Sequence, residues 1–201
     1  MHPYGTDSPE RRYVPLLLAG LAIAAALALF SLLDALSIRL PWWIGPPSTM
    51  AFYGMFYGLF EKKLWRVDVL HTLGLVKIPI LDGAWKGTIT TSFDEHAATH
   101  DVEVEISQTW TRIGVKLRGR DSKSHTLAAT LLVDSPEGVR FSYEYRNEPL
   151  SHAVGSMQIH NGTARLTLTN TGRLEGEYYS GRGRQNFASI RLERKRPGLM
   201  A

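Results

Sequence analysis

Two arginines near the end of the chain, Arg182 and Arg184, are the residues best suited to hold a ligand. They belong to the segment GEYYSGRGR, which begins at Gly176 and whose alternating pattern predicts a β-strand. Tyr178, Ser180 and both arginines share one face, and two glycines occupy the other, so we assign the arginine face to the interior. Guanidinium groups are costly to bury without a carboxylate on the same face. A bound anion would offset that cost, and phosphate matches the planar fork of arginine.

Neighbouring predicted strands add aromatic and amide groups to the same interior. The inward positions of residues 101–111 end in Gln108 and Trp110, and those of residues 139–147 end in Tyr143, Tyr145 and Asn147. Aromatic rings can stack on nucleobases, amides and hydroxyls can read their polar edges, and arginine can hold phosphate. The predicted ligand-binding residues are Gln108, Trp110, Tyr143, Tyr145, Asn147, Tyr178, Arg182 and Arg184, with His160, Ser122 and Ser124 joining from loops.

The same pattern allows a second interpretation, in which these residues form a polar core that fills the structure. Arg182 and Arg184 would then reach the rim or pair with Glu175 or Glu177. A slip of one residue in register would also reverse every inward assignment. The residue pattern alone leaves both interpretations open.

No other group of residues predicts catalysis or a metal site. Asp94, Glu95, His96, His100 and Asp101 crowd one predicted turn, but their spacing matches no closed zinc site and is typical of a solvated loop. The chain has no cysteine and no G-x-S-x-G motif, and most acidic residues fall on outward positions. No helix follows the GRGR segment to form a phosphate-binding loop. We therefore predict a protein that is not an enzyme and has neither a metal nor a cofactor.

The pattern from Ile78 onward is entirely that of β-strands. The pair Asn161–Gly162 predicts a tight hairpin turn. Short strands joined by short turns predict an antiparallel β-barrel of about eight strands, which can hold one small ligand. The candidate strands are residues 84–93, 101–111, 114–120, 126–133, 139–146, 156–159, 164–169, 174–184 and 188–194.

Two uncharged apolar runs, Val14–Leu33 and Leu40–Phe60, precede the β-region. Each reaches the ~20 residues that cross a bilayer, so the fold class is a membrane helical hairpin followed by an all-β domain. The second run contains Gly54 and Gly58, a G-x-x-x-G spacing that suits association between chains or packing against the first helix. A secretory signal peptide is the alternative for the first run, but that run is long and a second one follows at once.

Basic residues flank the outer ends of this pair of runs, so both termini and the barrel are predicted to be cytoplasmic. The net charge of +4 is modest and does not indicate a DNA- or RNA-binding surface. The predicted organisation is a polar N-terminus (1–12), two transmembrane helices (13–64), a juxtamembrane linker (65–77), a β-barrel sensor domain (78–196) and a tail (197–201), with residues 1–10 expected to be disordered.

The chain resembles the CBASS antiphage effectors that join two transmembrane helices to a β-strand-rich (SMODS-associating) barrel, over roughly residues 46–194. The segments that carry the resemblance are AFYGMFYGLFEKKLW, IPILDGAWKGTITTSFD, VEISQTW, the Ser122-x-Ser124 pair, FSYEYRNEP, MQIHNGTARL and GEYYSGRGR. The chain departs from the family pattern at Thr91, where a serine is expected, at Asp121, which replaces a serine, and at Ser180, which replaces a threonine.

The resemblance implies a receptor in the bacterial inner membrane. Its activating ligand would be a cyclic dinucleotide made by a partner nucleotidyltransferase. Binding would drive homo-oligomerisation of the membrane helices, disruption of the inner membrane and abortive infection. The resemblance assigns ligand binding to Gln108, Trp110, Tyr143, Tyr145, Asn147, His160, Tyr178, Arg182 and Arg184. Two alternatives are a membrane-tethered, lipocalin-like carrier of an apolar ligand and a structural barrel that binds a protein partner.

Overall fold

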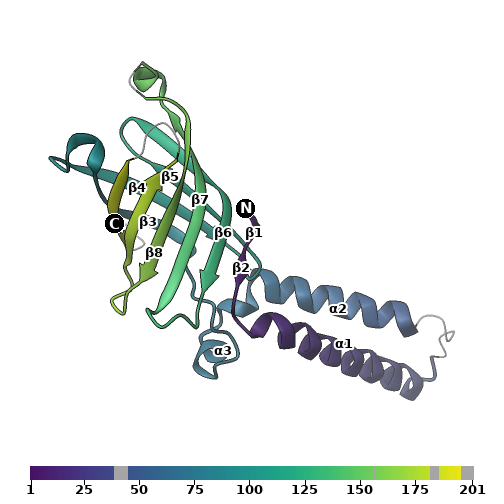
Figure 1. Ribbon diagram of the computed structural model, residues 1–201. Coiled ribbons are helices and arrows are strands. Elements are labelled where there is room, and N and C mark those ends of the chain that lie inside the picture. The colour runs from purple at the N-terminus through teal and green to yellow at the C-terminus, as the bar shows by residue number, and fades with distance from the viewer. Residues whose placement is uncertain (39–44, 156, 182–185, 196–201) are drawn as a thin grey trace, which may run out of the picture. The chain divides into compact units, whose positions relative to one another are not determined.

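The computed structural model describes residues 1–38, 45–155, 157–181 and 186–195, and the chain divides into two units. One unit comprises Met1–Asp7 together with the residues from Ile78 onward, and the other comprises Ser8–Lys77. The first unit is built mainly of strands and the second of helices (Figure 1).

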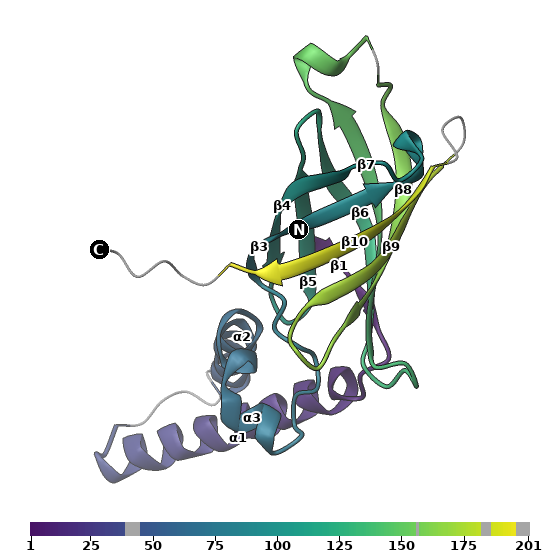
Figure 2. The same cartoon turned by 90° about the vertical axis from the view of Figure 1, so that its left-hand side faces the viewer.

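Strands β3 to β10 form a closed antiparallel barrel (Figures 1 and 2). Each strand pairs with its sequence neighbours, β10 returns to pair with β3, and the β5–β6 pairing completes the circle. This confirms the predicted membrane-helix and β-barrel fold class. The strands are β3 (Gly83–Thr91), β4 (Thr99–Gln108), β5 (Arg112–Arg118), β6 (Ser122–Leu132), β7 (Val139–Pro149), β8 (His160–Leu168), β9 (Leu174–Ser180) and β10 (Phe187–Arg194).

The barrel interior follows the alternation of the sequence. On β7, Phe141, Tyr143, Tyr145 and Asn147 are buried while Glu144 is exposed, as the parity of the segment predicts. The inward residues of β10 are the predicted Ala188, Ile190 and Leu192. Aliphatic and aromatic side chains from every strand therefore form one continuous core.

One end of the barrel is closed by the segment that leads into β3. Ile78 and Leu81 are fully buried there. The Leu81 backbone N–H donates to Gln108 Oε1 at 2.7 Å, and the Leu81 carbonyl accepts from Trp85 Nε1 at 2.9 Å. Because side chains satisfy both backbone groups of Leu81, this plug is fixed in position.

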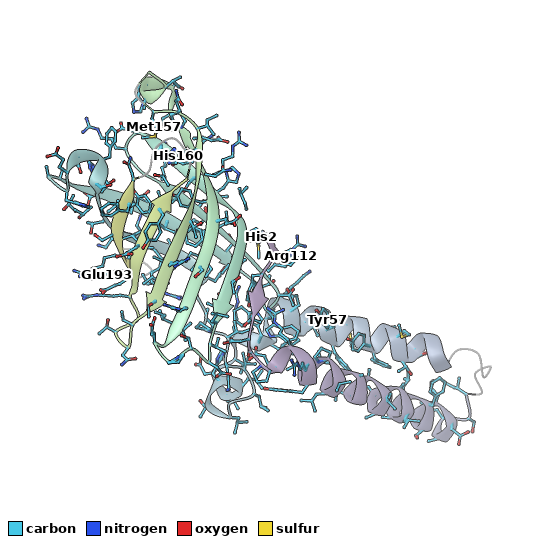
Figure 3. All side chains as sticks on the ribbon, in the orientation of Figure 1. His2, Tyr57, Arg112, Met157, His160 and Glu193 are labelled. Carbon is cyan, nitrogen blue, oxygen red and sulfur yellow. The ribbon has the colours of Figure 1, made fainter. Side chains whose placement is uncertain are left out.

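The first seven residues, which we call the amino-terminal strap (Met1–Asp7), belong to the barrel unit. The strap contributes β1 (His2–Pro3), which pairs antiparallel with β5, and β2 (Gly5–Thr6), which pairs parallel with β6. In Figure 3, His2 and Arg112 lie next to each other at this edge. The expectation of a disordered start was wrong for these residues, because strand pairing and a buried Tyr4 hold them on the barrel.

The predicted hairpin turn at Asn161–Gly162 was also wrong. Both residues lie inside β8, which pairs with β7 and β9. A Cβ atom on Gly162 would lie 2.4 Å from the hydroxyl of Tyr145 and 2.3 Å from the carbonyl oxygen of Tyr179. The glycine is therefore required for close packing within the sheet and not for a turn. Residues 157–159, part of the predicted strand 156–159, have no regular structure; residue 156 lies outside the described residues.

The helical unit consists of α1 (Glu10–Ala35), α2 (Gly45–Lys62) and the short α3 (Asp68–Thr72). Val14, Leu18, Ala22 and Ala26 form a buried stripe at intervals of four residues along α1, which packs against α2. Within the described residues, α1 is the one helix long and apolar enough to cross a membrane. The first half of the predicted second span includes residues 40–44, which lie outside the described residues, so the two-helix topology stays a prediction.

Two contacts fix the start of α1 to the end of its own unit. The Glu10 carboxylate accepts hydrogen bonds from the Ser8 hydroxyl and from the Lys77 backbone N–H. The Tyr13 hydroxyl donates to the Leu75 carbonyl at 2.6 Å. The two points at which the chain enters and leaves the helical unit are therefore held together.

Candidate ligand-binding site in the barrel mouth

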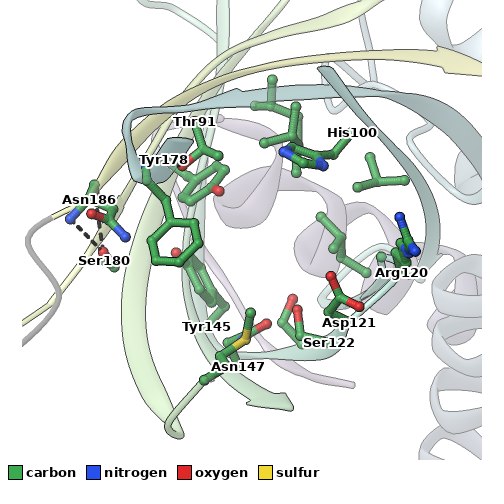
Figure 4. Close-up of a pocket in the computed structure, with 18 of the residues that line it drawn as sticks. Thr91, His100, Arg120, Asp121, Ser122, Tyr145, Asn147, Tyr178, Ser180 and Asn186 are labelled. Atoms are coloured by element: carbon green, nitrogen blue, oxygen red, sulfur yellow. Dashed lines mark hydrogen bonds between the residues drawn. The ribbon is translucent and has the colours of Figure 1, made fainter. Parts of the chain in front are cut away.

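A cavity of about 220 Å³ opens at the end of the barrel opposite the Leu81 plug (Figure 4). The ends of β3, β5, β7 and β9 and the starts of β4, β6 and β8 contribute side chains to it, as expected for one mouth of an up-and-down barrel. Ile89, Val102, Leu117 and Ile190 supply an aliphatic lining below the polar rim. The site therefore combines an apolar surface with polar groups at its entrance, which is typical of small-molecule sites.

Five of the predicted ligand-binding residues come together in this cavity: Tyr143, Tyr145, Asn147, His160 and Tyr178. Their rings form a ladder towards the mouth. The Tyr143 and Tyr145 ring centroids are 6.3 Å apart, and the Tyr145 and Tyr178 centroids are 6.1 Å apart with their planes at 82°. These edge-to-face contacts fix the aromatic side chains before any ligand arrives.

Burial and hydrogen bonds set the chemical state of the ladder. Burial raises the pKa of Tyr143, so its phenol is neutral throughout the physiological range. The Tyr145 hydroxyl donates to the Tyr179 carbonyl at 3.4 Å, and Asn147 Nδ2 donates to the Met157 sulfur at 3.3 Å. Neutral hydroxyl and amide groups can donate and accept, as recognition of base edges requires.

The turn between β5 and β6 forms the opposite wall. Ser122 and Ser124 line the cavity, as predicted, together with Arg120 and Asp121. Asp121 pairs with His152 at 3.2 Å, whereas Arg120 makes no ion pair within the described part of the chain. Arg120 is therefore the described guanidinium group that could meet an anion at the mouth.

The structure does not bring Gln108 and Trp110 into this cavity. Both are buried, but they lie at the plugged end of the barrel. Besides accepting from Leu81, Gln108 donates to the Pro79 carbonyl at 3.1 Å, and the Trp110 carbonyl accepts from Tyr4 at 2.7 Å. Their contacts are thus structural. Arg182 and Arg184 lie outside the described residues, and their placement stays a prediction.

Sequence reasoning missed several lining residues, including Thr91, Phe93, Met157 and Asn186. Thr91 continues the inward parity of Trp85 and Ile89 on β3, so the alternation of that strand could have identified it. Met157 and Asn186 lie outside regular strands, where no periodicity assigns an interior face. Ser180 and Asn186 are held together across the β9–β10 connection, where the Ser180 hydroxyl donates to the Asn186 carbonyl at 3.0 Å (Figure 4).

A protein-family profile described as "Cap15, cyclic dinucleotide receptor domain" matches residues 76–194, which include the whole barrel apart from the strap. The chain belongs to the Cap15 family. This membership confirms the resemblance to CBASS antiphage effectors.

Two curated relatives of the Cap15 family are similar to most of the chain. "CD-NTase-associated protein 15" of Yersinia aleksiciae is 28% identical over 148 residues, which are 73% of this chain and 69% of the relative. The protein of the same name from Staphylococcus schleiferi is 23% identical over 135 residues, which are 67% of this chain and 70% of the relative. The family match includes every cavity-lining residue named above.

Proposed function

We propose that the barrel binds a cyclic dinucleotide in its mouth and that the protein is a membrane-bound effector of antiphage defence. The observation that carries the proposal is the cavity itself, which places a fixed tyrosine ladder beside hydroxyl, amide and guanidinium groups inside a receptor-family domain. The names of the relatives support a nucleotidyltransferase partner that makes the ligand. On this proposal the protein is a receptor and not an enzyme.

Each wall of the cavity suits a different part of such a ligand. The half-buried ring of Tyr178 can stack on a base, and Asn147 with Ser122 and Ser124 can read its polar edge. Arg120 can meet a phosphate at the rim. Arg182 and Arg184 remain the predicted ligands of the second phosphate.

The membrane segments are proposed to carry the output, by associating in the bacterial inner membrane after ligand binding and disrupting it. In support, α1 has the length and hydropathy of a membrane span. On α2, a Cβ atom built at Gly54 or Gly58 would meet no described atom within 4 Å, so this G-x-x-x-G face is not used against α1. It is free for close packing against a second copy in lipid.

The proposal is tested by isothermal titration of the full-length protein, in detergent micelles or nanodiscs, with cyclic di-GMP, cyclic di-AMP and cyclic GMP–AMP. We expect Arg120→Ala to weaken binding of the best ligand by about fivefold or more, because a charge-assisted hydrogen bond is lost. Arg118→Ala is the matched control, since Arg118 lies on the same hairpin and does not line the cavity. Absence of binding to every member of the panel by the wild-type protein would overturn the proposed function.

A carrier of an apolar ligand is the second candidate, and the aliphatic lining favours it. The same titration with a fatty acid distinguishes the two. Binding of the fatty acid that Tyr178→Ala leaves unchanged, with no nucleotide binding, would establish the carrier.

A further inference from the structure

The seam between β5 and β6 has the shortest ladder of the barrel. These strands pair at three positions, from Lys116 opposite His125 to Arg118 opposite Lys123. The ladders at the other seams, among the described residues, run over six to ten residue pairs. Because each pair adds backbone hydrogen bonds, this seam is the part of the wall that separates most easily.

The amino-terminal strap fills the space where β5 and β6 diverge. Pro3 lies opposite Arg112 on β5, and Gly5 lies beside Thr130 on β6, so the strap bridges the two strands. The Arg112 guanidinium donates to the Met1 carbonyl at 3.0 Å. The Tyr4 side chain is buried, with 8% exposure.

Thr126 joins all three segments of the seam. Its hydroxyl oxygen accepts from the Val115 backbone N–H of β5 at 3.1 Å and forms a 3.0 Å hydrogen bond with His2 Nε2 of the strap. On the other side of the strand, the register of β6 against β7 shifts immediately after it, between Thr126 and Ala128. The side chain therefore adds a bond to β5 directly beyond the last β5–β6 pair, Lys116 with His125.

The strap ends where the chain leaves for α1. The two carboxylate oxygens of Asp7 accept from the backbone N–H groups of Val133 at 2.8 Å and of Asp134 at 3.2 Å, at the end of β6. Ser8 and Glu10, which follow directly, begin the helical unit. A displacement of the strap therefore acts on the first residues of α1 through a covalent link of one or two residues.

The turn end of the β5–β6 hairpin forms one wall of the cavity. Leu117, Arg120, Ser122 and Ser124 line the site, so β5 and β6 connect ligand and strap. The cavity of about 220 Å³ is smaller than the roughly 300–1,000 Å³ of sites for drug-sized ligands, and a ring of two nucleotides needs more room. If such a ring enters the cavity, we expect the wall to move outward first at its shortest ladder.

From this geometry we propose that the amino-terminal strap is a releasable part of the barrel wall, loosened when a ligand fills the mouth, and that its release changes the tether between receptor and α1. The inference rests on the proposed function, because it requires a ligand in this cavity. A ligand that favours the loosened strap must bind less tightly when the strap is locked, since the coupling free energy is reciprocal.

The test locks the strap with a disulfide in the full-length protein. The variant is Pro3→Cys with Arg112→Cys, because opposed residues of an antiparallel pair have Cα separations of roughly 4.5–5.5 Å, within disulfide range. The chain has no other cysteine, so the bond is unique. The controls are the same protein after reduction and the single Pro3→Cys variant. The probe is the member of the cyclic dinucleotide panel that binds wild type most tightly.

We expect the oxidised variant to bind about fivefold or more weakly than the reduced variant, the lower end of typical coupling. Thr126→Val loosens the seam without a cross-link, and we expect it to bind more tightly than wild type. Hydrogen exchange of the strap amides should also quicken when ligand is added to wild type. Equal binding by the oxidised and reduced forms, with strap exchange unaffected by ligand, would overturn the inference. That result leaves the proposed function intact, whereas no binding by wild type removes both.

Discussion

Tyr145 and Gly162 lie opposite each other on β7 and β8, and the missing side chain at Gly162 leaves room for the Tyr145 ring. The tyrosine ring points into the barrel and occupies the space that a Cβ atom on residue 162 would need. The aromatic ladder thus depends on a residue that has no side chain.

Gly162→Ala is expected to lower the free energy of unfolding by about 1–3 kcal/mol, because the new methyl group would overlap the Tyr145 ring and the Tyr179 carbonyl. Denaturant unfolding followed by tryptophan fluorescence measures the change. Gly155→Ala is the matched control, since a Cβ atom there meets nothing within 4 Å. Equal stability of the two variants would contradict the packing role of Gly162.

Gln108 was predicted to bind ligand, but in the structure it holds the Leu81 plug and does not line the cavity. Replacement by alanine leaves the buried Leu81 N–H without its acceptor, and we expect a loss of about 1–3 kcal/mol in stability. The nucleotide dissociation constant of the folded variant should stay within about twofold of wild type. Gln158→Ala, an exposed glutamine, is the control. Weaker nucleotide binding by this variant at unchanged stability would show that Gln108 contacts the ligand.

At the scale of elements, the β3–β4 connection is a short 3₁₀ turn, η3 (Ser92–Asp94), at the cavity rim. Its last residue, Asp94, accepts a 2.8 Å hydrogen bond from His100 at the start of β4, and this bond lowers the pKa of the Asp94 carboxyl. A folded pKa below the unfolded value means that the ionised carboxylate favours the folded state. That contribution is present at neutral pH and is lost as the pH falls through the folded pKa.

Asp94→Asn should therefore lower the melting temperature at pH 7, and the gap from wild type should close as the pH falls below the usual range of aspartate. Differential scanning fluorimetry across pH 3–7 measures the melting temperatures of the variant and of the wild type. Glu95→Gln in the same turn serves as control. A gap that stays constant with pH would show that the hydrogen bond, and not the charge, is what matters.

Periodicity predicted which side chains face the interior, because one face of every strand is covered. The inward residues of β4, β7 and β10 were predicted in this way. The alternation along a strand tells which side chains face the interior, but it does not tell at which end of the barrel they lie. Gln108 ends the second barrel strand and Asn147 lies near the end of the fifth, so in an up-and-down barrel they lie at opposite ends. Applying the alternation of strand direction to the sequence would have separated them.

Other features could not be predicted from local patterns. The strap has too few residues to show any period, and its strands exist only because β5 and β6, more than a hundred residues later, offer them partners. Asn161–Gly162 has the composition of a tight turn, but packing of the Tyr145 ring overrides that preference. Both errors arise where contacts distant in sequence decide the local structure.

At the scale of the whole molecule, the proposed topology depends on whether α2 crosses the membrane as α1 does. The 26 residues of α1 extend roughly 39 Å, enough for a hydrocarbon core of about 30 Å. The 18 residues of α2 extend roughly 27 Å, so their span would also need residues before Gly45. If α1 alone crosses, Leu36 and the barrel lie on one side and the strap on the other, which its pairing with β5 and β6 does not allow. If both cross, Leu36 and the barrel lie on opposite sides.

We expect Leu36→Cys to react with a membrane-impermeant maleimide in intact spheroplasts, and Lys123→Cys on the barrel to react only after lysis. Both native side chains are exposed, and the chain has no other cysteine to react. Labelling of both variants in intact spheroplasts, or of neither, would contradict the two-span topology.

The amino-terminal strap also imposes an order on biosynthesis. The ribosome makes the strap before the helical unit, and the strands that hold the strap only after that unit. The strap must therefore wait for both β5 and β6 before each of its strands has a partner. A polypeptide whose synthesis stops before β6 lacks five of the eight barrel strands, so unfinished copies already at the membrane could neither form the cavity nor hold the strap.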